Sequence, residues 1–171
     1  MNKKWQSVAL LLMLLSTVLM VSCSGAAKPK DGDTVKVAYT LTLEDGTVYD
    51  KSADGEPFEF TLGNKEVITG FEDAVKGLKV GETKTVTLPP DKAYGQINNN
   101  LIQVVNRSQL PTDMVPTVGQ YITGQSSADG TTRTFLITAV TDTTVTVDGN
   151  NPLAGKTLTF EITLVEITAS K

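Results

Sequence analysis

The chain has 171 residues, with 15 basic and 19 acidic side chains, no histidine and one cysteine. The absence of histidine excludes catalytic triads that use imidazole and zinc metalloprotease motifs, and together with the single cysteine it excludes nearly all structural zinc sites. One cysteine also excludes an intramolecular disulfide. Scattered basic residues in an acidic chain argue against nucleic-acid binding. Because no glycine-rich phosphate or dinucleotide loop is present either, the sequence predicts neither a metal site nor a cofactor.

The first 22 residues have the pattern of a secretory signal peptide. Residues 1–4 are short and basic, residues 8–21 are almost wholly apolar, and small residues follow at 22–25. The apolar stretch is brief and has no stop-transfer flank, so we expect cleavage rather than a membrane-spanning helix. An uncleaved membrane anchor is the alternative.

The only cysteine, Cys23, follows a segment, residues 19–22, that resembles a bacterial lipobox. The resemblance implies that Cys23 is lipid-modified and becomes the first residue of the mature chain; a free thiol beside an ordinary cleavage site is the alternative. Two or more acyl chains anchor a protein stably. We therefore expect a lipid anchor on the extracytoplasmic side of the cell membrane or outer membrane, with residues 23–30 as a polar tether.

The residues after the tether alternate between apolar and polar, as half-buried strands do. The alternation covers residues 35–43, and Asp45 and Gly46 then turn the chain. Further strands are predicted at residues 48–49, 58–62, 83–88 and 158–164. One short helix is predicted over residues 69–78, where apolar side chains recur at helical spacing. These elements predict an α+β fold in which an antiparallel sheet wraps on a short helix.

The composition changes between residues 96 and 148, where asparagine, glutamine and threonine become frequent. Short β-prone runs occur at 121–122, 134–140 and 144–147. Because ordered loops longer than about 15 residues are uncommon, we interpret this segment as a small β-rich domain inserted into a first domain made of residues 31–95 and 149–168. A long irregular loop is the alternative.

Several motifs resemble the FKBP-type peptidyl-prolyl isomerases, namely residues 35–50, 56–63, 66–71 and 91–95. Residues 98–104 and 147–155 are similar to the SlyD-like subgroup, in which a second domain interrupts the isomerase. The resemblance implies the FKBP-like fold and prolyl isomerase activity. That activity needs none of the missing groups, because an apolar cavity can hold the twisted amide and lower a barrier of about 20 kcal/mol.

The resemblance also implies a set of site residues. Asp50 would orient a tyrosine of the cavity, Tyr94 would donate a hydrogen bond to a bound carbonyl, and the backbone of Val67 and Ile68 would bond the ligand. The implied catalytic residues are Tyr39, Asp50 and Tyr94. The implied substrate-binding residues are Tyr49, Phe58, Phe60, Val67, Ile68, Phe71, Leu153 and Phe160. Phe60 and Phe160 could equally be plain sheet core, and Tyr39 and Phe71 are core in either interpretation.

The chain departs from SlyD-like proteins at two places. Asn151 stands where a histidine is common, and no histidine-rich tail is present, so nickel binding is not expected. The leading hypothesis is a monomeric isomerase that assists the folding of extracytoplasmic proteins and holds unfolded or proline-containing polypeptides through its inserted domain. The alternatives are a non-catalytic holdase or peptide-binding lipoprotein, and a surface adhesin or structural lipoprotein of the cell envelope.

Overall fold

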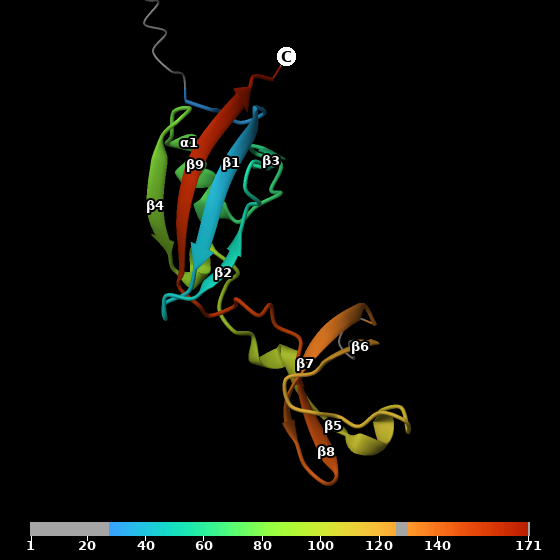
Figure 1. Cartoon of the computed structure of the whole chain (residues 1–171). Coiled ribbons are helices and arrows are strands. Elements are labelled where there is room, and N and C mark those ends of the chain that lie inside the picture. The colour runs from blue at the N-terminus through green and yellow to red at the C-terminus, as the bar shows by residue number, and fades with distance from the viewer. Residues whose placement is uncertain (1–27, 126–129, 171) are drawn as a thin grey trace, which may run out of the picture.

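The computed structural model describes residues 28–125 and 130–170. The predicted signal peptide and Cys23 lie outside these residues. Within the described residues, the strands form two antiparallel sheets, one with five strands and one with four. Figure 1 shows them at opposite ends of the molecule, joined by two connecting segments of the chain.

The five-stranded sheet contains β1 (Thr34–Thr42), β2 (Val48–Lys51), β3 (Phe58–Thr61), β4 (Thr83–Leu88) and β9 (Leu158–Thr168). Its order is β2-β1-β9-β4, and β3 pairs with β1 as well. β3 pairs with the first half of β1 and β2 with its last three residues, so β1 changes partner along one edge. β9, which returns from the C-terminal part of the chain, lies at the centre and closes the sheet.

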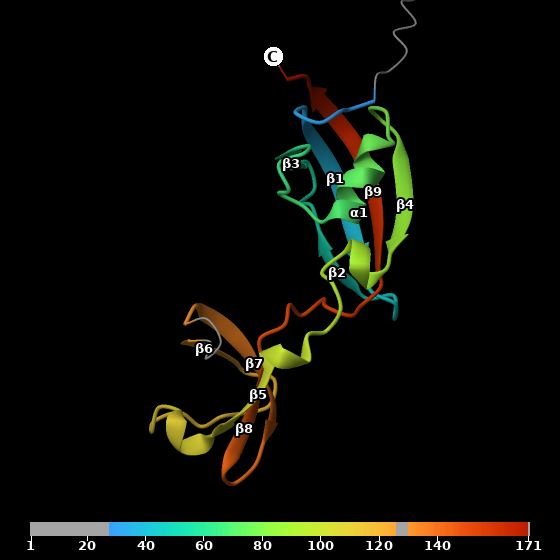
Figure 2. The same ribbon diagram turned by 180° about the vertical axis from the view of Figure 1, so that it is seen from behind.

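The helix α1 (Thr69–Lys76) packs against one face of this sheet (Figure 2). The alternation predicted for β9 places Leu158, Phe160, Ile162 and Leu164 on the buried face. Each fully buried side chain of this size stabilises the fold by about 1.5–3 kcal/mol. The predicted α+β fold, an antiparallel sheet on one short helix, is confirmed.

The helix approaches the sheet closely at Gly70. A Cβ atom at this position would lie 2.6 Å from Cδ2 of Leu88 and 2.9 Å from the carbonyl oxygen of Lys92. Lys92 belongs to a short 3-10 turn, Pro90–Lys92, that follows β4. Glycine therefore allows the first turn of α1 to meet the end of β4, which brings Phe71 next to the sheet.

The second sheet consists of β5 (Ile102–Asn106), β6 (Tyr121–Gln125), β7 (Thr132–Val140) and β8 (Thr144–Asp148), in the order β5-β8-β7-β6. Three of these strands lie at the β-prone runs of the sequence, and β5 was not predicted. Its core is separate from that of the first sheet, and its buried residues are Phe135, Ile137, Val145 and Val147. Short 3-10 turns at Asn99–Leu101 and Arg107–Gln109 flank β5.

The two connecting segments are hydrogen-bonded to each other. The side chain of Asn150 accepts a bond from the Asn98 N–H at 2.9 Å and donates one to the Asn98 carbonyl at 3.1 Å. The Gly155 N–H donates to the Gly95 carbonyl at 2.8 Å. Because a short ladder of bonds links the segments, the chain leaves and re-enters the five-stranded sheet side by side.

The two ends of the described chain meet at Asp33, which is 4% exposed. Its carboxylate accepts bonds from the backbone N–H of Lys30 and of Ser170, each at 3.0 Å. Pro29 is also buried, so the last residues of the predicted tether pack into the fold. These ends lie at the end of the sheet that is far from the second sheet (Figure 1).

Candidate active site

A cavity of about 420 Å³ opens beside α1 on the five-stranded sheet. Its walls come from β1, β2, β3, α1 and β9 and from the segment between β3 and α1. The lining residues are Tyr39, Leu41, Asp50, Phe58, Lys65, Glu66, Val67, Ile68, Phe71, Tyr94 and Phe160. We call this space the aromatic cavity.

Aromatic rings from four elements form its inner surface. The ring of Phe71, on α1, meets the ring of Tyr39 edge to face at 5.8 Å between centroids and that of Phe160 at 5.2 Å. Phe58 meets Tyr39 edge to face at 6.2 Å. Such ring pairs contribute about 0.5–1.5 kcal/mol each beyond their burial, so they fix the shape of an apolar surface open at one side.

One polar pair is built into this apolar surface. The Tyr39 hydroxyl donates a hydrogen bond of 2.7 Å to Oδ2 of Asp50, whose Oδ1 accepts from the Lys51 N–H at 2.9 Å. The β1–β2 pairing brings the two residues together, because Asp50 lies opposite Leu41, two residues beyond Tyr39. Directly after the end of β2, Ser52 Oγ accepts a hydrogen bond from the Tyr39 N–H at 3.1 Å.

The environment keeps both tyrosines of the cavity protonated. Burial raises the pKa of Tyr39 to about 12, and the hydrogen bond to Asp50 and its negative charge act in the same direction. Burial also raises the pKa of Tyr94, with smaller contributions from Asp50 and Tyr49. Both effects disfavour the phenolate, so each hydroxyl can act as a hydrogen-bond donor at neutral pH.

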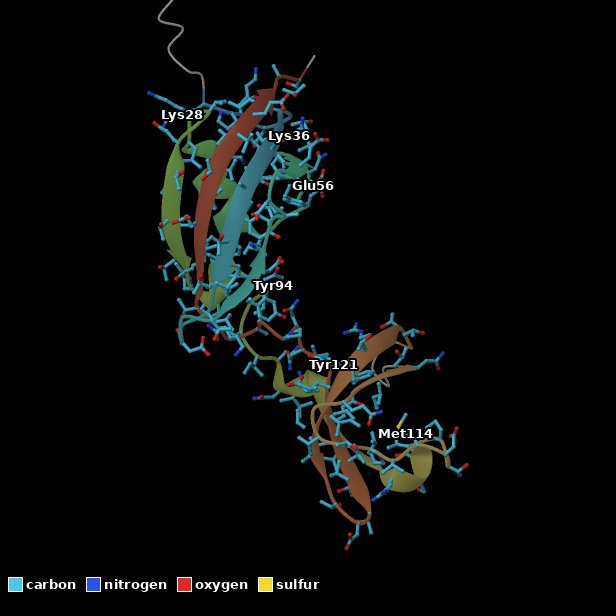
Figure 3. The ribbon with its side chains drawn as sticks, in the orientation of Figure 1. Lys28, Lys36, Glu56, Tyr94, Met114 and Tyr121 are labelled. Carbon is cyan, nitrogen blue, oxygen red and sulfur yellow. The ribbon has the colours of Figure 1, made fainter. Side chains whose placement is uncertain are left out.

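Further hydrogen-bonding groups lie around the mouth of the cavity. Tyr94 follows the Pro90–Lys92 turn, remains 42% exposed and lies at the end of the sheet that faces the second sheet (Figure 3). Ile68 precedes α1 and accepts bonds from the first turn of the helix through its carbonyl. Within the described residues, no partner accepts a bond from the Ile68 N–H. The cavity therefore combines an aromatic floor with free donors.

The structure brings together eight of the eleven site residues implied by the sequence, those from Tyr39 to Phe160 that line the cavity. The other three are elsewhere. Phe60 is 2% exposed and lies behind Phe58 and Phe71 in the core, and Leu153 is 5% exposed in the same core. Tyr49 is 49% exposed and does not line the cavity.

Three lining residues were missed from the sequence: Leu41, Lys65 and Glu66. Leu41 continues the alternation of β1 on the face of Tyr39, so the period of two could have identified it. Lys65 and Glu66 gave no such signal, because a turn rather than a strand places them. Within the described residues, no group of three potential metal-binding side chains is found.

The groups that line this cavity suit the binding of a peptide amide rather than its cleavage. It offers aromatic surface, hydroxyl and amide donors, and two carboxylates that each already accept a hydrogen bond, Asp50 from Tyr39 and Glu66 from Asn64; the chain has no histidine to serve as a base. A twisted X-Pro amide has lost its conjugation and needs an apolar surface and a few donors. The fold and site thus define a peptide-binding cavity of the prolyl isomerase type.

Comparison with known proteins gives the same class. The model of the FKBP-type peptidyl-prolyl cis-trans isomerases matches residues 25–165. A short-type peptidyl-prolyl cis-trans isomerase of Methanocaldococcus jannaschii is 41% identical over 81% of this chain and 93% of its own length. The FKBP-type isomerase SlyD of Treponema pallidum is 38% identical, over 75% of this chain and 72% of its own. An FKBP-type 16 kDa isomerase of Escherichia coli is 34% identical, over 81% and 93%.

This chain belongs to the FKBP-type peptidyl-prolyl cis-trans isomerase family and has SlyD-like homologues. It is a peptidyl-prolyl cis-trans isomerase, an enzyme that acts on proline-containing polypeptides. The uncatalysed rotation of an X-Pro bond takes tens of seconds or longer and can limit folding. An enzyme of this class removes that delay.

Proposed function

We propose that this isomerase works at the aromatic cavity, that its second sheet holds unfolded clients, and that Cys23 anchors it by a lipid on the extracytoplasmic side of a membrane. The observation that carries the first part is the Tyr39–Asp50 pair set among Phe58, Phe71 and Phe160. The function that follows is folding assistance for extracytoplasmic proteins whose refolding is limited by prolines.

The aromatic floor would receive the proline ring of the substrate. The ring is apolar and would lie against Phe71, while Tyr94 O–H and the Ile68 N–H would donate to carbonyl oxygens on either side of the rotating bond. Asp50 would hold the Tyr39 hydroxyl so that the floor keeps its shape. Because the rotation breaks no covalent bond, catalysis would come from binding the twisted amide more tightly than the planar one.

The four-stranded sheet would hold client segments near the cavity. It exposes apolar side chains that do not pack into the core of the five-stranded sheet; Val104 is 67% exposed and Tyr121 is 56% exposed. Its outer strands β5 and β6 each pair on one side within the sheet, which leaves backbone groups for an extended chain. Holding a client close to the cavity raises the local concentration of its prolines.

Removing the second sheet tests this division of roles. In the variant, a short Gly/Ser turn replaces residues 99–149, and the bond between Asn98 N–H and the Asn150 side chain is kept. Isomerisation of a short proline peptide should largely survive, whereas catalysis of proline-limited refolding of an unfolded protein should fall roughly tenfold or more, since the second hold is lost.

Two outcomes would contradict the proposal. Equal losses on both substrates in a well-folded variant would mean that the second sheet serves the cavity itself. No loss on either substrate would leave the sheet without a holding role. Asp50→Ala in the full chain provides the matched control, because it should slow both substrates. A full chain that binds unfolded protein but does not speed refolding would favour the non-catalytic holdase.

The anchor has its own test. The described chain begins at the end of the five-stranded sheet that is far from the second sheet (Figure 1), so an anchor at Cys23 would leave the second sheet directed away from the membrane. Within residues 28–125 and 130–170, α1 and the 3-10 turns fall short of what a membrane crossing requires. Cys23→Ala should move the protein from the membrane to the soluble fraction or leave its signal uncut. Wild-type protein in the soluble fraction, with an unmodified N-terminus, would refute the lipid anchor.

A further inference from the structure

The turn that leads into the cavity wall has an unusual residue. Lys65 has φ of 58°, and among the described residues it is the one non-glycine with positive φ. Glycine or asparagine adopts this left-handed conformation more readily, because the Cβ atom of other residues crowds the carbonyl. Such a conformation persists only where the surrounding structure fixes it, and residues of this kind cluster at active sites and ligand-binding sites.

The turn determines where the next residues lie. β3 ends at Thr61, Gly63 follows it with φ of 87°, and the Asn64 N–H donates to the Thr61 carbonyl at 3.3 Å. After the left-handed step at Lys65 the chain runs along the cavity, so that residues 65–68 line it without a break. The strained residue is therefore part of the wall, at its exposed rim.

The charged groups of the cavity differ in what they already bind. Asp50 accepts the Tyr39 hydroxyl at 2.7 Å, and Glu66 accepts a bond from the Asn64 side-chain amide at 3.0 Å. In the described part of the chain, no carboxylate lies within 4.0 Å of the Lys65 ammonium, whereas Lys36 and Lys76 each have such partners. Within the described residues, Lys65 is thus the charged group of the cavity whose N–H donors can still bind a substrate group.

We propose that Lys65 is a specificity-determining residue that pairs with the carboxylate of a glutamate or aspartate next to the proline of the polypeptide substrate. This inference rests on the proposed function of the aromatic cavity. The ring contacts bind proline whatever its neighbours are, and Lys65 adds a preference among neighbours. The chain is acidic overall, with a formal charge of −4, so its long-range field disfavours acidic segments and the preference has to come from this local cation.

A peptide series measures the preference directly. Protease-free kcat/KM is determined for proline peptides with glutamate, glutamine or lysine at each position within two residues of the proline. Each variant is scored by the ratio of the glutamate to the lysine peptide. Exposed ion pairs are weak, so Lys65→Gln should lower this ratio roughly threefold and Lys65→Glu roughly tenfold, at one position of the series more than at the others.

Matched variants separate charge from strain and from overall charge. Lys65→Arg retains the cation on the same backbone and should keep the ratio, and Lys84→Glu, exposed on β4 away from the cavity, should leave it unchanged. Added salt should shrink the wild-type ratio towards one. A ratio that is the same in the wild type, Lys65→Gln and Lys65→Glu would overturn the inference.

The same assay distinguishes failure of this inference from failure of the proposed site. Asp50→Ala should slow all peptides of the series alike. If Asp50→Ala does so and the Lys65 variants keep the wild-type ratio, the cavity is the site and Lys65 does not select substrates. If Asp50→Ala leaves every peptide at the wild-type rate, the site itself is misplaced and the Lys65 inference falls with it.

Discussion

At the scale of single residues, the cavity depends on how one carboxylate is satisfied. Asp50 is exposed on β2, yet both of its oxygens accept bonds, from Tyr39 and from the Lys51 backbone. A hydrogen bond to a charged acceptor is stronger than a neutral one, so the pair holds the Tyr39 ring against Phe58 and Phe71. A polar contact thus maintains the shape of an apolar surface.

Substitutions at Asp50 and Tyr94 should therefore have unequal effects. Tyr94→Phe removes one donor and should lower kcat/KM roughly fivefold, the equivalent of about 1 kcal/mol. Asp50→Ala leaves the Tyr39 hydroxyl without its partner and should cost more, roughly tenfold or above. Protease-free isomerisation of a proline peptide is the measurement. Asp50→Asn keeps an acceptor and should fall between the wild type and Asp50→Ala; two well-folded variants at the wild-type rate would contradict the assignment.

The raised pKa of Tyr39 makes a prediction about pH. Its pKa of about 12 in the folded chain lies above the ordinary value of 10.0, so the folded state holds this proton more tightly. The resulting contribution to stability is complete below about pH 10 and is lost as the pH rises through about 12. Accordingly, kcat/KM should show no titration of Tyr39 between about pH 6 and about pH 9. A tyrosinate absorbance that arises from Tyr39 below pH 10 would contradict this.

At the scale of elements, strands were predictable where one face alone is buried. β1 and the first part of β9, residues 158–164, alternate between apolar and polar residues, and β4 was predicted from its β-branched residues; the positions of all three agree with the structure. β5 was missed because Val104 and Val105 are adjacent apolar residues, one exposed and one half-buried, which breaks the period of two.

The cavity was predictable to a similar extent. Side chains that come from strands and from α1 were found from the motifs that carry the family resemblance. Lys65 and Glu66 were not, because a left-handed turn places them and local sequence specifies such a turn weakly when its residue is not glycine. Leu153 was expected in the wall because it lies within a family motif, residues 147–155, and in the structure its side chain is buried in the core.

Gly70 makes a prediction about the packing of α1. Alanine normally favours a helix over glycine by about 1 kcal/mol, yet here its Cβ would lie 2.6 Å from Leu88. Gly70→Ala should therefore lower the free energy of unfolding by about 1–3 kcal/mol, the usual cost of overpacking. Urea unfolding measures the change. Asp73→Ala, exposed on the same helix, is the control, and a Gly70→Ala protein as stable as the wild type would show that the contact can relax.

At the scale of the whole molecule, the two ends of the described chain are bonded together at one end of the five-stranded sheet, and the second sheet lies beyond the other end (Figure 1). Asp33 links Lys30 and Ser170, near the two ends of the described chain, and the Asn98–Asn150 bonds link the two segments that lead to the second sheet. Figure 2 shows the second sheet set apart from the first, beyond the end where Tyr94 lies. The cavity therefore lies between the closed end and the proposed client-holding sheet.

The Asp33 link should make the fold sensitive to acid. Hydrogen bonds from the backbone of Ser170 and Lys30 lower the pKa of Asp33 below its ordinary value of 3.8. The stabilisation is present above that value and is lost as the pH falls through the lowered pKa. Asp33→Asn should lower the Tm by a few degrees at neutral pH and flatten its fall in acid. Calorimetry against pH measures this, with Asp54→Asn, 98% exposed, as the control; identical pH curves would rule out the link.

The measurement that tests the central claim most directly is amide NMR of the chain titrated with a short proline peptide. If the aromatic cavity is the isomerase site, the peptide should shift the amide signals of Val67, Ile68, Phe71 and Tyr94, and the cis and trans forms of the peptide should exchange in the same sample. Asp50→Ala should weaken both effects together. Cis–trans exchange accompanied by shifts confined to residues 102–148, with the cavity signals unmoved, would contradict the account.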